Sequence, residues 1–234
     1  MTARSAVPAG LAIVALLALA SLCVGFAELD LRTVLTDPGA ALLLSASRVP
    51  RTLAAILTGA SMAVAGLIMQ VIVRNRFVEP TTAGTAQSAA LGLLAVVMLA
   101  PGAPLLVKMT AASITALAGT AFFLLLVRRL PPSQPLLVPL VGIVFGGIIG
   151  AVETFIAYEA DLIQYLGVWM NGEFSGVIAG RYELLWLCGA MAALAFFTAD
   201  RFTVASLGRE ASTGLGLDYG RTLALGLTVV AMTT

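Results

Sequence analysis

Long apolar runs separated by short polar stretches dominate the pattern of hydrophobic and polar positions along the chain. A helix needs about 20 mostly apolar residues to cross a lipid bilayer, so each long run predicts a transmembrane helix. Uncharged runs occur at 6–27, 52–73, 80–107, 109–127, 131–152, 184–199 and 222–234. The last run holds 13 residues, too few to cross. We therefore expect an all-α membrane protein with six full spans, the later ones lengthened by neighbouring residues, and a partial seventh.

The first run could also be read as a cleaved signal peptide. Arg4 supplies a positive charge ahead of it, but the run at 6–27 is longer than the usual apolar core of a signal peptide, about 7 to 15 residues. We therefore interpret it as a retained helix.

One polar stretch stands out between the last two apolar runs. It reads "FTVASLGREASTGLGLDYGR", residues 202–221, and carries four charged residues and four glycines. It is too polar to lie in lipid and too short to form a domain. The pattern predicts a structured segment at one membrane surface.

The distribution of charged residues predicts the orientation of the chain. With the N-terminus in the cytoplasm and alternating spans, eight of the 13 basic residues fall on the cytoplasmic side. Eight of the 12 acidic residues, Glu153 among them, fall outside. Cytoplasmic loops carry an excess of Lys and Arg, which supports this orientation. It places 202–221 in the cytoplasm.

Composition supports a lipid-covered surface and excludes several chemistries. Hydrophobic residues make up 60% of the chain and charged residues 11%, against about a quarter charged in soluble domains. Histidine is absent, which removes the commonest general base and most zinc sites. The single lysine, Lys108, follows "PLLV" rather than a glycine loop, so any nucleotide would bind to another chain. A net charge of +1 gives no reason to expect nucleic acid as a partner.

Small residues recur at helical spacing inside three runs. Such faces let helices approach closely in lipid, and they can also line a wide path where bulk is unwelcome. Both interpretations stay open. The faces are Ala55, Gly59 and Ala63; Gly84, Ser88 and Gly92; and Gly142, Gly146 and Gly150.

Two glutamines are the polar side chains expected at depth in the membrane. Gln70 and Gln87 either form hydrogen bonds between helices or contact a polar solute. No Asp, Glu, Lys or Arg falls clearly at mid-membrane in the predicted spans, where ion-coupled carriers usually place an ionisable group. This argues against a proton- or sodium-driven carrier.

Residues 48–92 carry a resemblance to a known family. They read "RVPRTLAAILTGASMAVAGLIMQVIVRNRFVEPTTAGTAQSAALG", with an Arg-x-Pro-Arg entry, a small-residue helix ending in Gln, and a turn containing "RN" and "EP". The pattern resembles the permease subunits of ABC importers for iron–siderophore complexes and vitamin B12, the FecCD-like family. The resemblance continues through 140–176 and 207–221. The wording "NRFVEPTTAGTAQSA" is most similar to the branch that serves catecholate siderophores such as enterobactin.

This resemblance implies a type II importer fold of about ten helices per subunit, with two permease subunits per transporter, identical or related. It implies three kinds of partner: an ABC ATPase dimer, a periplasmic or lipid-anchored siderophore-binding protein, and the second permease. It also implies the cytoplasmic membrane of a bacterium, alternating access and no cofactor. On this interpretation 1–234 is an incomplete transmembrane permease domain, either a fragment or a truncated product.

The resemblance implies roles for residues at the second, third and fifth helices. Arg48 and Arg51 would dock acidic residues of the binding protein, the alternative being interfacial anchors whose heads reach the surface. The turn "RNRFVEP" contains the breakers Asn75 and Pro80. The cytoplasmic gate implied by the family is Asn75, Arg76, Phe77, Pro135 and Leu136. The implied translocation path is Gly84, Gln87, Ser88, Gly142, Gly146 and Gly150.

The stretch 159–176 is too polar for a span but carries one apolar helical face, made of Leu162, Tyr165, Leu166 and Trp169. Aromatic residues favour the membrane interface, so we expect a short interfacial helix on the outer side.

The stretch 202–221 would form two short cytoplasmic helices that fit a groove on the ATPase. A coupling surface must be short, rigid and cytoplasmic, and glycines allow the sharp turns this needs. The residues expected to couple to the ATPase are Leu207, Gly208, Arg209, Glu210, Ala211, Leu215, Gly216 and Leu217. A secondary carrier of a small metabolite and a truncated, non-transporting remnant remain the alternatives.

Overall fold

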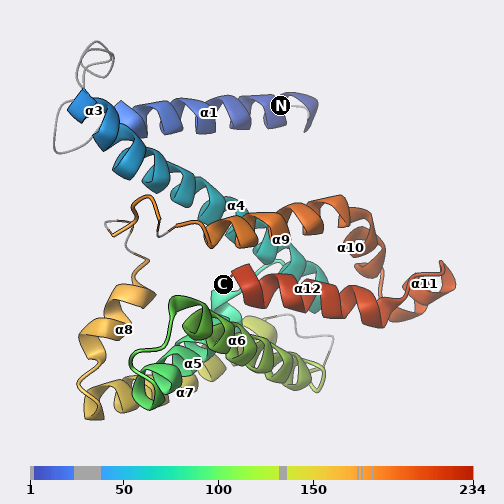
Figure 1. The fold of residues 1–234 in the computed structure, drawn as a ribbon. Helices are drawn as coiled ribbons and strands as arrows, with labels where there is room; N and C mark the ends of the chain where they lie inside the picture. The colour runs from blue at the N-terminus through green and yellow to red at the C-terminus, as the bar shows by residue number, and fades with distance from the viewer. Residues whose placement is uncertain are drawn as a thin grey trace. The chain divides into compact units, whose positions relative to one another are not determined.

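The computed structural model describes residues 3–23, 38–131, 136–172, 174, 176–180 and 182–233. Every regular element within these residues is helical, as the apolar runs predict (Figure 1). The elements are α1 (Ala3–Cys23), α3 (Pro38–Leu43), a π-helical turn η1 (Leu44–Arg48), α4 (Val49–Val73), a 3₁₀ turn η2 (Thr81–Ala83), α5 (Thr85–Leu99), α6 (Leu105–Val127), α7 (Leu137–Glu159), α8 (Ile163–Met170), α9 (Leu185–Phe197), α10 (Ala199–Ala205), α11 (Arg209–Gly214) and α12 (Tyr219–Thr233).

Three helical stretches in the described part of the chain are long and apolar enough to cross a membrane. They are Pro38–Val73, Leu105–Val127 and Leu137–Glu159, of 36, 23 and 23 residues. The helices α9 and α10, bent by 60° at Thr198, would together make a fourth. Val7–Cys23 and Thr85–Leu99 are shorter apolar helices. Each predicted run thus falls on a helix, although several helices are shorter than their runs.

The run at 80–107 shows why a run and a helix differ in length. Its helix begins only at Thr85, because Gly84 adopts φ 71 and ends the preceding 3₁₀ turn. It ends at Leu99, ahead of Pro101 and Pro104, which cannot continue a helix. The apolar composition continues beyond both ends of α5, but the helical conformation of the backbone does not.

The described residues form two compact units. The first comprises 1–57 and 174–187. Within it, Arg48 donates from Nη1 to the carbonyl oxygens of Leu22 and Cys23 at 2.8 and 3.0 Å. These are terminal carbonyls of α1, which have no partner inside their own helix. Arg48 therefore caps α1.

The second unit comprises 58–173 and 188–234. Its core draws apolar side chains from α4, α6, α7, α9, α10 and α12. Gly226 of α12 permits close packing there, since a Cβ would come within 2.9 Å of Ile68, Ile72 and Phe202. The fully buried members of the core are Ala65, Met69, Val78, Ala83, Phe123, Val229 and Val230.

Within the second unit, α5 and α6 pack closely because small residues line their contact. A Cβ on Gly92 would overlap the side chain of Thr115, and one on Gly119 would overlap Ser88. The buried hydroxyls of Thr85 and Thr120 form a 2.9 Å hydrogen bond across the same contact.

Candidate functional site: the coupling segment and the ends of the spans

The polar stretch 202–221, the coupling segment, runs from the last turn of α10 to the first turn of α12. Between these lies one six-residue helix, α11, Arg209–Gly214. Within 202–221 the structure has one complete short helix, α11, and the end of α10, which continues the bent pair with α9, so the expected pair of short helices is present only in part and its coupling role stays a prediction.

Gly208 forms the turn that starts α11. Its backbone lies at φ 101 and ψ 168, a conformation essentially restricted to glycine. Its carbonyl oxygen accepts the first bond of α11, from the Ser212 N–H at 2.8 Å. A Cβ at this position would also overlap the guanidinium of Arg74. Gly208 is thus required by its backbone, whereas the exposed Arg74 side chain would have to move to make room for a Cβ.

Ser212 ties α11 to α10. Its hydroxyl is fully buried and donates to the carbonyl oxygen of Val204 at 2.8 Å. The other end of α11 closes with Leu217 N–H to Ser212 O at 2.9 Å and Gly216 N–H to Thr213 O at 3.0 Å, with Gly216 at φ 82. This is the Schellman arrangement that ends many helices. α11 is held at both ends by short local bonds.

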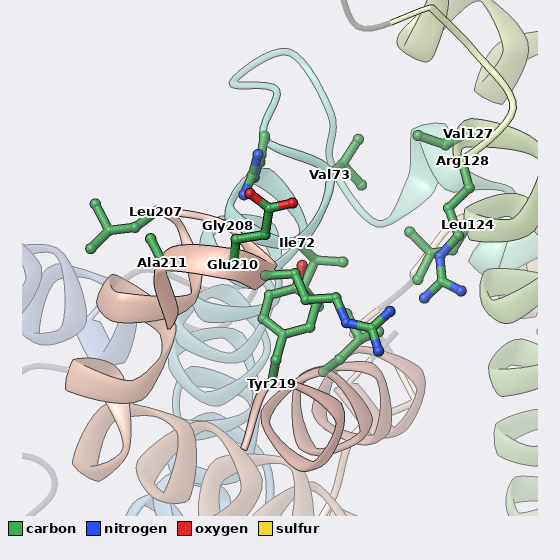
Figure 2. Close-up of a pocket in the computed structure, with 13 residues that line it drawn as sticks. Ile72, Val73, Leu124, Val127, Arg128, Leu207, Gly208, Glu210, Ala211 and Tyr219 are labelled. Carbon is green, nitrogen blue, oxygen red and sulfur yellow. The ribbon is translucent and has the colours of Figure 1, made fainter. Parts of the chain in front are cut away.

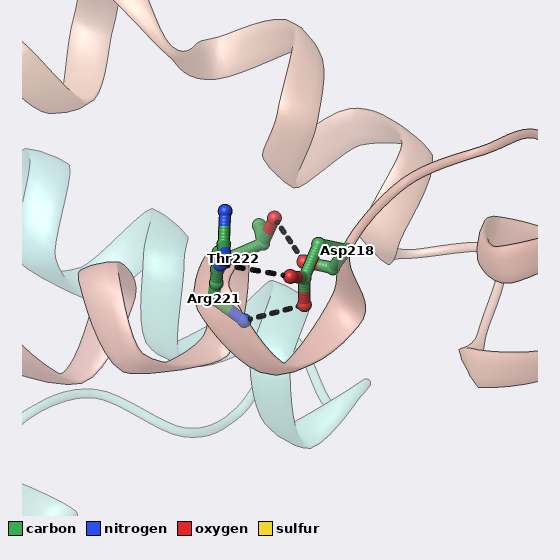
Figure 3. A network of polar contacts seen from close by, with 3 residues as sticks. All are labelled: Asp218, Arg221 and Thr222. Carbon is green, nitrogen blue, oxygen red and sulfur yellow. Dashed lines mark hydrogen bonds and ion pairs between the residues drawn. The ribbon is translucent and has the colours of Figure 1, made fainter.

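Asp218 caps α12 (Figure 3). Its Oδ1 accepts from the Arg221 N–H at 3.0 Å, and the Thr222 hydroxyl donates to its carbonyl oxygen at 3.0 Å. Oδ2 also pairs with Arg221 Nε at 3.0 Å, but these side chains are 57% and 88% exposed. Exposed ion pairs contribute little to stability, so the cap is the larger effect.

The outward face of the coupling segment is apolar as well as charged. Leu207 and Leu215 are 60% and 67% exposed. Arg209, Glu210 and Ala211 are exposed too, whereas Leu217 is half-buried and Gly208 is buried. Two exposed leucines on a polar segment are compatible with a docking surface but do not by themselves indicate one.

A pocket of about 690 Å³ lies beside the coupling segment (Figure 2). It is an open pocket bordered by the ends of α4 and α6, the start of α11 and the first turn of α12. The lining residues are Ile72, Val73, Arg74, Leu124, Val127, Arg128, Leu207, Gly208, Arg209, Glu210, Ala211, Tyr219 and Leu223.

The turn after α4 contains the predicted gate residues. Arg74 adopts φ 54 and ends α4 in a second Schellman arrangement, with Arg74 N–H to Val71 O at 3.2 Å and Asn75 N–H to Gln70 O at 3.0 Å. Asn75 is buried, and its Oδ1 accepts from the Phe77 N–H at 2.9 Å. A tight turn is therefore present where the breaker residues predicted one.

The remaining gate residues lie at the surface of this chain. Arg76 and Phe77 are exposed. Leu136, the residue before α7, is exposed as well. Pro135 lies outside the described residues. The structure thus brings Asn75, Arg76 and Phe77 into one turn, while their role as a gate stays a prediction.

The small residues expected to line the path pack against neighbouring helices. A Cβ on Gly142 would overlap the carbonyl oxygen of Thr82, and one on Gly84 would come within 3.3 Å of the Gly146 Cα. Ser88 faces α6 instead, beside Gly119, and donates to the Gly84 carbonyl oxygen at 2.8 Å. These contacts are what the packing interpretation predicts.

Two polar side chains lie on the same α5–α7 contact. A Cβ on Gly150 would lie 3.6 Å from Gln87 Cγ, and one on Gly146 would lie 3.6 Å from its Oε1. Glu153 follows on the buried face of α7 and is 3% exposed. In the described part of the chain, neither Gln87 Oε1 nor Glu153 Oε2 has a hydrogen-bond partner.

The position of Glu153 corrects one inference from the charge pattern. Glu153 was assigned to an outer polar segment because the apolar run ends at residue 152. The helix α7 instead continues to Glu159, and Glu153 lies inside it on a buried face. An ionisable side chain is therefore present within a candidate span.

The short helix α8 lies within the predicted interfacial stretch. Leu166 is buried with Ala90, Leu94 and Ala157, and Leu162 packs against this cluster. Tyr165 and Trp169, the aromatic residues of the expected face, lie next to each other with ring centroids 6.1 Å apart. Lys108 Nζ lies 5.8 Å from the Tyr165 ring centroid, within cation–π range.

The two predicted docking arginines differ in their surroundings. Arg48 is buried and caps α1 through the bonds described above. Arg51 is exposed. The interfacial-anchor alternative does not describe Arg48, whose head group is directed to backbone carbonyls.

The comparison with known families covers nearly the whole chain: residues 13–234 match the FecCD transport family. The chain belongs to this family. The family-level resemblance inferred from residues 48–92 is thereby confirmed. The catecholate branch is a finer assignment that the match does not address.

Curated relatives include three permease proteins. The petrobactin import system permease protein YclN of Bacillus subtilis is 44% identical over 191 residues, covering 82% of this chain and 60% of the relative. The petrobactin import system permease protein FatD of Bacillus anthracis is 44% identical over 186 residues, covering 80% and 56%. The ferric-anguibactin transport system permease protein FatD of Vibrio anguillarum is 38% identical over 188 residues, covering 80% and 60%. The matched region is thus less than two thirds of each relative.

The fold also matches a solved structure. An inward-facing conformation of a metal-chelate type ABC transporter superposes with a TM-score of 0.71 at 22% sequence identity, covering 96% of this chain and 73% of the other. This likeness shows that the FecCD-family chain has the fold of an ABC transporter membrane subunit.

Sequence reasoning missed several residues that organise the site. Ser212 was read only as part of a polar stretch, and Asp218 only as a charge. An Asp directly before a helix is an N-cap signal, and the sequence carries it at Asp218. Arg74 as a turn residue had no such signal, since arginine seldom adopts positive φ.

Proposed function

We propose that the chain is the membrane-spanning part of an importer permease that moves an iron(III)–siderophore complex across the cytoplasmic membrane of a bacterium. The observation that carries this proposal is the FecCD family match over residues 13–234. Relatives named for petrobactin and ferric-anguibactin systems support iron chelates as the cargo class. The sequence has no P-loop, so ATP hydrolysis falls to a separate subunit.

The coupling segment, 202–221, is the proposed contact with an ABC ATPase dimer. Leu207, Leu215 and Ala211 offer an exposed apolar surface flanked by the charges of Arg209 and Glu210. Movement of α11 would reach α10 through the Ser212–Val204 bond. It would reach the end of α4 through the Gly208–Arg74 contact. Alternating access follows if these helices move together.

The other partners are a siderophore-binding protein and a second permease subunit. Arg51 is exposed and is the proposed docking contact, with buried Arg48 holding the adjoining α1 in place. Arg76 and Phe77, exposed in the turn after α4, would meet their counterparts near the subunit axis as a gate. Gln87 is the polar side chain proposed to face the path. We also propose a cytoplasmic N-terminus, on the distribution of the basic residues.

A catecholate siderophore is the cargo that we propose to test first, on the resemblance of residues 75–89. The chain would be reconstituted in proteoliposomes with the ATPase and binding protein encoded beside a FecCD permease. Uptake of ferric enterobactin, ferric petrobactin and cobalamin would then be compared. Vanadate-sensitive uptake of a ferric chelate is expected. Uptake that persists without the ATPase would contradict the proposal.

Assembly with the ATPase tests the coupling assignment separately. Replacing Gly208–Ala211 with bulky acidic residues is expected to abolish co-purification of the ATPase while membrane insertion is retained. The matched control replaces the exposed residues Met98 and Leu99, at the far end of α5, with the same residue types. Co-purification that survives the first change would refute the coupling assignment.

A secondary carrier is the second candidate, because Glu153 is buried inside a candidate span. Carriers driven by protons commonly use such a carboxyl. Under this alternative, Glu153→Gln would abolish uptake, and uptake would collapse with an uncoupler rather than with vanadate. Under the proposed function, uptake depends on ATP supply both in the unmodified chain and in Glu153→Gln.

A further inference from the structure

The pocket beside the coupling segment has a marked charge asymmetry. Arg74 follows α4, Arg128 follows α6 and Arg209 starts α11, so three arginines from three separate elements line it. Glu210 is the one acidic residue among the lining side chains. The lining therefore carries a net charge of two positive units.

These arginines are not neutralised by neighbours. Among the described residues, the ion pair within 4 Å is Arg221 with Asp218, which lies outside the pocket. All three pocket arginines are exposed. Guanidinium groups are well suited to phosphate oxygens because they offer parallel donors. Three arginines in the lining of one pocket favour an anionic ligand.

The rest of the lining is apolar. Ile72 and Val73 come from the end of α4, and Leu124 and Val127 come from the end of α6. Figure 2 shows Val127 and Arg128 on one side of the pocket and Leu207 and Ala211 on the other, with the Tyr219 ring between them. The pocket thus combines a basic rim with an apolar wall at the ends of two candidate spans.

We propose that this pocket binds the headgroup and glycerol region of an anionic phospholipid from the inner leaflet. Basic pockets between transmembrane helices on the cytoplasmic side recognise acidic headgroups. A pocket of about 690 Å³ exceeds the needs of one phosphate ion and suits a headgroup with its glycerol. Because the pocket borders α11, the bound lipid would brace the coupling segment against α4 and α6. The leaflet assignment rests on the proposed function.

Phosphatidylglycerol binding to the purified chain in a neutral detergent tests this proposal. Native mass spectrometry would measure the affinity for a short-chain phosphatidylglycerol, with phosphatidylcholine and inorganic phosphate as separate arms. Arg128→Gln removes one pocket charge and is expected to weaken phosphatidylglycerol about five-fold, since one surface arginine contributes about that factor. Arg209→Gln is a second variant with the same expectation.

Arg129→Gln is the matched control, because Arg129 is the next residue, is exposed and does not line the pocket. Its affinity is expected to equal that of the unmodified chain. Equal weakening by Arg128→Gln and Arg129→Gln would show bulk charge attraction and overturn the site. Competition by millimolar inorganic phosphate, or equal binding of phosphatidylcholine, would overturn the lipid assignment.

The ATPase distinguishes this proposal from the coupling assignment. Arg128 lies outside the proposed ATPase contact, so Arg128→Gln is expected to keep co-purification of the ATPase. If ATPase binding instead displaces phosphatidylglycerol stoichiometrically, the pocket belongs to the ATPase contact and the proposal that the lipid braces the coupling segment fails. If the ATPase still co-purifies but no phosphatidylglycerol binding is detected, the lipid proposal is rejected and the coupling assignment is not.

Discussion

The guanidinium of Arg74 lies against the α-carbon of Gly208, where the Cβ of any other residue would overlap it. Arg74 ends α4 at φ 54, and Gly208 starts α11 at φ 101. Two turns with unusual backbone conformations therefore meet at one point. The contact brings the start of α11 next to the end of α4, a candidate span.

Gly208→Ala is expected to destabilise the coupling segment and lower ATPase assembly. The new Cβ meets Arg74, and the backbone conformation itself costs about 1 to 3 kcal/mol for a residue other than glycine. Gly214→Ala is the control, since nothing lies within 4 Å of its Cβ position and its φ is not positive. Co-purification with the ATPase measures both variants. Equal assembly would show that the Gly208 turn adapts.

Ser212→Ala is expected to loosen α11 from α10. It removes the 2.8 Å bond to Val204, a loss of about 0.5 to 1.5 kcal/mol for a typical hydrogen bond. Thr213→Ala removes a neighbouring hydroxyl that bonds only within α11, to the Arg209 and Glu210 carbonyl oxygens. Limited proteolysis of the coupling segment should accelerate for Ser212→Ala and not for Thr213→Ala. The reverse order would exclude Ser212 as the tie.

Asp218 separates capping from ion pairing. Asp218→Ala removes the cap of α12 and is expected to cost about 0.5 to 2 kcal/mol. Asp218→Asn keeps an oxygen for the Arg221 N–H while removing the charge, and the exposed ion pair contributes less than about 1 kcal/mol. In thermal unfolding in detergent, Asp218→Asn should therefore be nearly as stable as the unmodified chain, and Asp218→Ala should be clearly less stable. Equal losses for both would assign the effect to the ion pair.

Gly142→Ala is expected to disrupt the packing of α7. Its Cβ would overlap the carbonyl oxygen of Thr82, a backbone atom that cannot rotate away. Overpacking of this kind costs about 1 to 3 kcal/mol. Gly147→Ala, in the same helix, has nothing within 4 Å and should be neutral. The folded fraction after detergent extraction would be measured for both variants. An unchanged folded fraction for Gly142→Ala would mean that the backbone of η2 shifts to make room for the Cβ.

The two arginines before and within α4 are expected to respond differently to substitution. Arg51→Glu should weaken capture of the binding protein, because an exposed negative charge would then face the acidic residues of that partner. Arg48→Gln should lower stability by about 1.5 to 3 kcal/mol, the range for hydrogen bonds to charged groups, because it caps α1. Capture and unfolding would be measured on each variant. Destabilisation by Arg51→Glu would assign it a structural role as well.

Much of the architecture could be predicted from the chain alone because lipid imposes a simple length requirement. Uncharged runs lead to α4 and α6 at nearly the expected bounds, whereas α7 extends seven residues beyond its run. Breaker residues near Asn75 predicted a turn that the backbone contains. The glycines of α7 could not be assigned in the same way, since helical spacing shows that a face is small but not which neighbour covers it.

The sequence by itself determined that this is an all-helical membrane chain interrupted by the polar segment 202–221, and its motifs carried the resemblance to the FecCD family. Local composition suffices for the helices and the interruption, because hydrophobic length and glycine content act residue by residue. Only the tertiary structure decided that Arg48 caps α1 and that Glu153 is buried within α7. It also decided that Gly208 lies against Arg74. Those outcomes depend on contacts between segments distant in the chain, or on where a helix ends, and periodicity along one helix does not encode them.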